Sequence, residues 1–198
     1  MSVETDAHGR DNLAVFQRKI IISRLGLWLF LVSDAFLFGG LLVSRAILWG
    51  NTRPELDQLL GLGVTSVLLL SSFFMNRAET AMAHGDSKEF FRDTLITLVL
   101  GVVFLVGVVG VEWPKATALG ITPDKDVYGA VFYMLTGMHA FHVLSGVLIL
   151  AIVLRNSRKG LYTSERHWAV EAAAVYWHFV DVVWIFFYPA LYLIGSLV

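Results

Sequence analysis

The sequence contains no cysteine, only four prolines and few charged residues, and these shortages narrow what the chain can be. Without cysteine it can form no disulfide bond, thiolate metal site or iron–sulfur cluster. Charged residues make up 16% of the sequence and the formal net charge is −1, so we expect no nucleic-acid partner. Residues 1–20 are polar and lack a long apolar run, so we expect no cleaved secretory signal.

What the sequence has in abundance is apolar residues, which make up 57% of it. A soluble domain of this composition would expose large apolar patches. A helix that crosses a membrane needs about 20 mostly apolar residues. Five segments meet this requirement, at residues 25–48, 59–75, 94–111, 128–154 and 168–198. The sequence therefore predicts an all-α integral membrane protein, a five-transmembrane-helix bundle over residues 24–198. Residues 1–23 are expected to form a polar cytoplasmic segment.

The stretches between these segments, including residues 76–93 and 112–127, are expected to be loops. Lysine and arginine are concentrated in the N-terminal segment and in the second and fourth of the four loops. Because cytoplasmic loops carry an excess of these residues, we expect the N-terminus in the cytoplasm and the C-terminus outside. Arg45, near the outer end of the first span, is expected to extend its charge to the membrane surface.

Ionisable residues lie within, or directly at the end of, four of the five spans. They are Asp34, Glu112, His139, His142, Glu171, His178 and Asp181. An ionised Asp at the bilayer centre costs roughly 2.5–3.5 kcal/mol if it faces lipid, so we expect these side chains to face protein. His139 and His142 are three residues apart and share one helix face, and Glu171, His178 and Asp181 form one polar stripe.

Three interpretations of this intramembrane polar set compete. A haem or metal site is chemically possible, but His139 and His142 lie on one face of one helix and cannot both be axial ligands of one haem. A proton or ion path is the second interpretation, because intramembrane carboxylates and histidines mark such paths. Hydrogen bonding between helices is the third. The residues alone leave the second and third open.

Several motifs resemble subunit III of haem–copper terminal oxidases. They are LGLWLFLVSDAFLFGGL (25–41), LLLSSFFM (68–75), FYMLTGMHAFHVLSG (132–146) and YWHFVDVVWIF (176–186), the last preceded by EAAA (171–174). The motifs occur in the order found in that family, and the resemblance extends over essentially all of residues 24–195. Five spans resemble the short bacterial form of the subunit.

The resemblance implies a non-catalytic subunit of a complex that reduces oxygen to water and pumps protons. The subunit would stabilise subunit I, its main interface, and support proton uptake. Subunit II, the other subunits and membrane lipids would be further partners in the bacterial inner (cytoplasmic) membrane. Haem and copper would lie in partner subunits and no metal on this chain, which would hold bound phospholipid. Cytochrome c is the expected electron donor, with quinol as the alternative.

The resemblance also bears on single residues. Asp34 matches the carbodiimide-reactive carboxylate of the family, which is often Glu, and we expect it to exchange protons and to pair with a histidine of the fourth span. Glu112 is a second candidate, although GVEW (110–113) departs from the family's aromatic-rich turn. A basic cluster after the fourth span, Arg155, Arg158 and Lys159, is expected to contact lipid phosphate.

Other functions remain open at this point. One is an accessory subunit of nitric oxide reductase, and another is a stand-alone transporter or haem-binding membrane protein.

Overall fold

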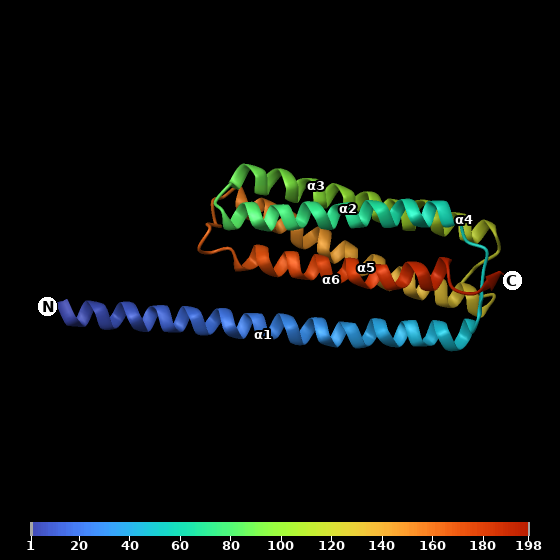
Figure 1. Ribbon diagram of the computed structural model, residues 1–198, viewed down its shortest axis with the longest axis horizontal. Coiled ribbons are helices and arrows are strands. Elements are labelled where there is room, and N and C mark those ends of the chain that lie inside the picture. Colours follow the sequence, from blue (N-terminus) through green and yellow to red (C-terminus); the bar gives the residue numbers. More distant parts are fainter. Residues whose placement is uncertain (1, 198) are drawn as a thin grey trace. The chain divides into compact units, whose positions relative to one another are not determined.

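The computed structural model describes residues 2–197, with side chains from residue 18 onward, and is largely helical (Figure 1). Its elements are α1 (Ser2–Trp49), β1 (Thr52–Arg53), α2 (Gln58–Ala83), α3 (Ser87–Leu105), the π-helix η1 (Val106–Glu112), α4 (Trp113–Ala118), α5 (Val127–Ser157), α6 (Trp168–Tyr192) and β2 (Ser196–Leu197). Within the described residues, five helical stretches are long and apolar enough to cross a membrane: Arg18–Trp49, Gln58–Ala83, Ser87–Ala118, Val127–Ser157 and Trp168–Tyr192. The predicted helical membrane fold is confirmed, and its orientation stays a prediction.

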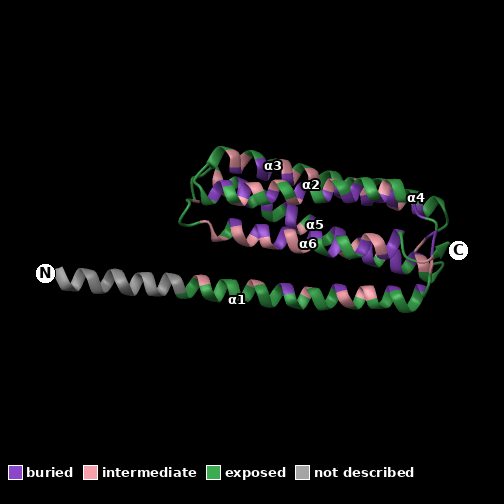
Figure 2. Cartoon of the chain, viewed as in Figure 1, coloured by how far each residue is buried: buried purple, intermediate pink, exposed green. Residues whose placement is uncertain are grey.

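The chain divides into two compact units, Met1–Phe36 and Leu37–Val198. The first unit belongs to α1, which continues without a break past residue 23, so the predicted start of the bundle falls inside one helix. In the second unit α2 contacts α3 and α6, and α5 contacts the same two helices, so that four helices close into a ring. Their inward faces are buried and their outward faces are exposed, as lipid-facing surfaces must be (Figure 2).

Three of these helices begin at an aspartate that caps the first turn. Asp57 accepts a hydrogen bond from the backbone N–H of Leu60, and Asp126 accepts one from Gly129. Asp86 accepts from two backbone N–H groups at the start of α3. Such caps satisfy N–H groups that have no partner within the helix, so these aspartates fix where each helix starts.

The predicted extents of two loops are wrong. Residues 76–93 were expected to lie outside the spans, but α2 runs to Ala83 and α3 begins at Ser87, which leaves a three-residue turn. The fall in hydropathy marks where the helices become polar, whereas the chain turns only at Gly85, whose φ of 80° suits glycine. Residues 112–118 are likewise helical, because α4 (Trp113–Ala118) continues directly from η1 past the end of the apolar run.

The last span is shorter than predicted, because α6 ends at Tyr192 and the chain then leaves the helix. Ser196 and Leu197 pair in parallel with Thr52 and Arg53 as a two-stranded sheet. Gly195 permits the change of direction with a φ of 111°.

The expectation that Arg45 extends its charge to the membrane surface stays a prediction. Its side chain is 4% exposed, and it donates hydrogen bonds to the carbonyl oxygens of Ile194 at 2.5 Å and Gly50 at 3.2 Å. These carbonyl groups lie outside regular helices and need donors, which the guanidinium supplies. Arg45 therefore anchors the C-terminal segment.

Candidate functional site

The polar stripe of α6 faces a matching row of polar residues on α2. Gln58, Thr65, Ser72 and Glu79 recur at intervals of seven residues along α2. Residues seven apart lie on the same helix face. Since α2 and α6 are antiparallel neighbours, this row meets α6 from its C-terminal end to its N-terminal end. We refer to the paired rows as the α2–α6 polar ladder.

At the end of the ladder formed by the start of α2, the Gln58 side chain donates a hydrogen bond to the carbonyl oxygen of Tyr192 at 3.1 Å. One heptad along, the Trp184 indole donates to the Thr65 hydroxyl at 2.9 Å. Trp184 is 1% exposed, so this bond satisfies a donor that has no access to water.

His178 and Asp181 occupy the middle of the ladder, and both lie near Ser72. The Ser72 hydroxyl is 2.6 Å from His178 Nδ1. It is also the polar neighbour of the Asp181 carboxyl. Asp181 is 3% exposed, and within the described residues its oxygens make no hydrogen bond of ordinary geometry. The structure thus brings together two predicted residues through Ser72, whose partner on α6 was not predicted.

Glu171 lies at the other end of the ladder, in the first turn of α6. Its carboxylate is 3.3 Å from His167 Nε2, and Glu79 of α2 is close enough for their charges to interact. The spacing of the polar residues in α6 predicts that half of the ladder, whereas the α2 half was not predicted. The available signal was the seven-residue interval from Ser72 to Glu79, which equals the interval from Glu171 to His178.

His139 and His142 are both buried in α5, as their spacing predicts. The His139 ring packs against Phe104 and Trp184, with centroid distances of 5.5 Å and 4.7 Å, and among the described residues neither of its nitrogens has a hydrogen-bond partner. His142 Nδ1 is 2.8 Å from the carbonyl oxygen of Met138 in its own helix. His139 is therefore held by aromatic packing.

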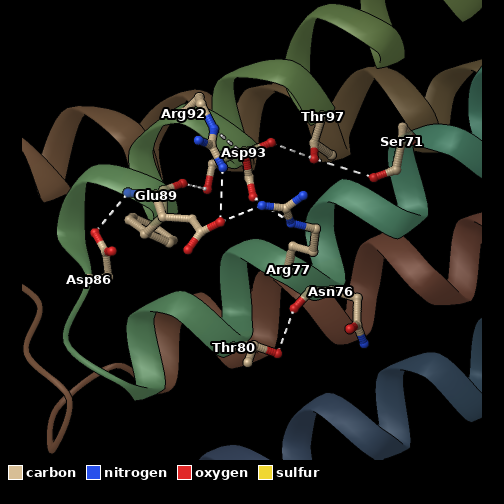
Figure 3. Close-up of polar contacts among 11 residues, drawn as sticks. Ser71, Asn76, Arg77, Thr80, Asp86, Glu89, Arg92, Asp93 and Thr97 are labelled. Carbon is tan, nitrogen blue, oxygen red and sulfur yellow. Dashed lines mark hydrogen bonds and ion pairs between the residues drawn. The ribbon is translucent and has the colours of Figure 1, made fainter.

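A second polar cluster, which was not predicted, joins α2 to α3 beside their turn (Figure 3). Asp93 is fully buried, and its two oxygens are 3.2 Å from Arg77 Nε and 2.8 Å from Arg92 Nε. Glu89 pairs with both arginines. The signal in the sequence was the spacing of Glu89, Arg92 and Asp93 within one turn. Hydropathy alone predicts a polar loop for this segment.

The other predicted residues lie elsewhere. Asp34 belongs to the first unit, and its pairing with a histidine stays a prediction. Arg155, Arg158 and Lys159 are exposed at the end of α5, where the Arg158 guanidinium lies over the Phe91 ring at 4.8 Å. Their contact with lipid also stays a prediction.

Glu112 ends the π-helix η1 and is 2% exposed. Among the residues described, no group of three or more His, Cys, Asp or Glu side chains is arranged to hold a metal ion.

Comparison with known proteins gives a consistent result. The model of the family described as cytochrome c oxidase subunit III matches residues 1–196. Cytochrome c oxidase subunit 3 of Thermostichus vulcanus is 34% identical over 177 residues, which cover 86% of each chain. The Synechocystis sp. protein of the same name is 36% identical, over 94% of this chain and 78% of the relative. Probable cytochrome c oxidase subunit 3 of Nocardia farcinica is 33% identical, over 96% of this chain and 99% of the relative.

Proposed function

Because the chain belongs to the cytochrome c oxidase subunit III family, we propose that it is the non-catalytic subunit of an aerobic terminal oxidase that reduces oxygen to water and pumps protons. The observation that carries the proposal is a family match over nearly the whole chain, on a fold with five helices able to cross a membrane. The family carries no redox cofactor of its own, so haem and copper belong to the other subunits of the complex.

We propose that its main partner is subunit I and that it stabilises that subunit. A stabilising subunit needs a rigid shape, and the α2–α6 polar ladder supports one, since hydrogen bonds fix the two helices in register from Gln58 to His178. Within this proposal the polar residues of α6 serve helix packing first. The bond from Trp184 to Thr65 favours this interpretation over a proton path, because an indole N–H donates but cannot relay a proton.

Proton uptake is the second part of the proposal, with Asp34 as the exchanging carboxylate. A carboxyl group inside a membrane is stable when it is neutral, and it can then release and regain a proton as its surroundings change. The proposed donor of electrons is cytochrome c, which the names of the relatives support. The bacterial relatives likewise support the bacterial inner membrane as its location.

We also propose that Arg155, Arg158 and Lys159 bind the phosphate of a phospholipid at the cytoplasmic surface. All three side chains are exposed at one end of a membrane-crossing helix. A lysine or arginine near an anionic leaflet gains roughly 1 kcal/mol of attraction.

The test is purification of the tagged chain from its own host under mild conditions. We expect a haem-containing subunit I to co-purify, with a reduced-minus-oxidised spectrum and oxygen consumption supported by reduced cytochrome c. Dissociation of the chain from that complex should leave the haem absorbance with the partner. Consumption of oxygen with quinol but not with cytochrome c would contradict the proposed donor. Recovery of the chain without any haem protein would contradict the proposed function itself.

A further inference from the structure

A hollow of about 320 Å³ lies beside the last turn of the third span, within the size range of small-ligand sites, roughly 300–1,000 Å³. Its wall is largely apolar and includes Leu56, Ala116 and Leu119. Three ionisable groups line it as well: Glu112, Asp57 and Lys115. An apolar hollow with a few polar groups is the usual form of a ligand site.

Glu112 is the most buried ionisable group that lines this hollow. Its side chain is 2% exposed, and neither carboxyl oxygen has a hydrogen-bond partner among the described residues. Burying a carboxylate without a partner is very costly, so the neutral acid is the form that this position accommodates. A neutral acid carries one O–H donor, and leaving that donor unused also costs free energy. The position therefore suits a ligand that brings an acceptor oxygen.

The π-helix contributes to this arrangement. It occupies Val106–Glu112 and ends at the residue that lines the hollow. Single π-helical turns inside α-helices recur at functional sites. The widened turn changes the direction in which the following side chains point.

Asp57 and Lys115 form an ion pair beside Glu112, with Lys115 Nζ 2.9 Å from Asp57 Oδ2. Both side chains are partly exposed, at 39% for Asp57 and 53% for Lys115. The backbone N–H of Leu60, followed by the Lys115 ammonium, holds the pKa of Asp57 below its ordinary value. The hollow thus presents one fixed negative and one fixed positive charge side by side.

We propose that this hollow binds a zwitterionic glycerophospholipid of the leaflet at this end of the span. The lipid phosphate pairs with Lys115, its ammonium pairs with Asp57, and an ester carbonyl accepts the hydrogen bond of Glu112. Lys115 lies three residues beyond Glu112, about 4.5 Å along the helix axis, which places an ester just below a phosphate. The apolar wall receives the start of an acyl chain.

The charge pair decides between ligand classes. An anionic lipid would meet Lys115 but would be repelled by Asp57, and a divalent cation would have to displace the Lys115 ammonium. A ligand that carries both charges can pair with both side chains and keeps the site neutral. The proposal does not depend on the electron donor or on the orientation of the chain.

The test uses the purified oxidase complex that contains the full chain, in nanodiscs with photoactivatable phosphatidylethanolamine. We expect cross-links in the peptide over residues 112–119. Glu112→Leu should reduce their yield about fivefold, equivalent to about 1 kcal/mol for one lost hydrogen bond. Glu112→Gln, which keeps a donor, should retain most of the yield. Glu55→Gln removes an exposed carboxylate of the same loop and should change nothing.

A second variant covers the case in which Glu112→Leu does not assemble. Asp57→Asn combined with Lys115→Gln removes both charges and leaves Glu112 in place, and it should also lower the yield. An equal yield with photoactivatable phosphatidylglycerol, or no loss in any of these variants, would overturn the proposal. Manganese binding, detected by paramagnetic resonance and lost in Glu112→Leu, would overturn it in favour of a cation site.

Discussion

The indole N–H of Trp177 on α6 donates to the hydroxyl of Ser71 on α2, across 3.0 Å in the buried interior of the bundle. The ring fits there because Gly101 of α3 and Gly146 of α5 leave room for it. An added Cβ would come within 2.5 Å of the indole at Gly101 and 2.8 Å at Gly146. One side chain therefore touches all three of the other helices in the ring.

A larger residue at position 146 should destabilise the bundle. Gly146→Leu would force Trp177 from its place, and overpacking of this kind costs roughly 1–3 kcal/mol. Ser71→Ala should lower the free energy of unfolding by less, about 0.6 kcal/mol, which is the average for a hydrogen bond between membrane helices. The midpoint of detergent-induced unfolding of the purified complex measures both. Gly63→Leu is the matched control, because a Cβ at Gly63 meets open space. Equal midpoints for the two leucine variants would contradict the prediction.

Either of the two arginines that contact Asp93 should be able to neutralise its charge when the other is removed. Arg77→Met or Arg92→Met alone should lower the unfolding midpoint only slightly, because both side chains are partly exposed and the remaining arginine still pairs with Asp93. The double variant should cost about 3–5 kcal/mol, since it leaves a fully buried carboxylate without a counter-charge.

Unfolding midpoints of the single and double variants form a double-mutant cycle that measures this coupling. Lys88→Met is the control, because it removes an exposed positive charge from the same turn. Strictly additive losses would show that the two arginines act independently of Asp93.

Hydropathy predicted the number and order of the spans, because about 20 consecutive apolar residues have few alternatives to crossing a membrane. It could not predict where the helices end. A helix that leaves the lipid becomes polar without stopping, as α2 does between Met75 and Ala83. The turn itself depends on Asp86 and Gly85, which are local signals that hydropathy averages away.

The candidate site, too, was predictable only in part. Spacing along one helix correctly placed His139 and His142 on a buried face, because that follows from helix geometry. Pairing between helices depends on which faces meet, and single-helix spacing does not contain that information. Ser72 therefore became visible as the partner of His178 only in the folded chain.

Asp34 should be more important for proton exchange than for assembly. Asp34→Asn keeps the shape and a hydrogen-bonding side chain but cannot ionise, so we expect assembly to survive and proton uptake during turnover to slow. Asp34→Leu removes the polar group and should lower the yield of assembled complex. Proton uptake by the reconstituted oxidase measures the first effect, with Asp124→Asn, at an exposed carboxylate, as the control. Normal uptake in Asp34→Asn would show that this carboxyl does not exchange protons.

The basic cluster at the end of α5 should retain anionic lipid. Replacing Arg155 and Lys159 by Gln should reduce the phospholipid that stays bound through purification, because each removes roughly 1 kcal/mol of attraction to an anionic surface. Mass spectrometry of the lipid bound per complex makes the measurement. The control is Lys125→Gln, at an exposed lysine just before the other end of the same helix. Unchanged lipid retention would leave these residues with a role in topology alone.

The orientation can be tested with labelled cysteines, because the chain has none of its own. The excess of lysine and arginine in the N-terminal segment and in the loops after the second and fourth spans predicts that these parts face the cytoplasm. Lys125→Cys places a cysteine in an exposed loop that is predicted to lie outside the cell. Glu165→Cys places one in an exposed loop that is predicted to lie in the cytoplasm. In intact spheroplasts a membrane-impermeant maleimide should label the chain at position 125 but not at position 165. After lysis it should label both, which shows that position 165 is reactive once it is accessible. Labelling of position 165 alone before lysis would reverse the orientation, with the N-terminus outside.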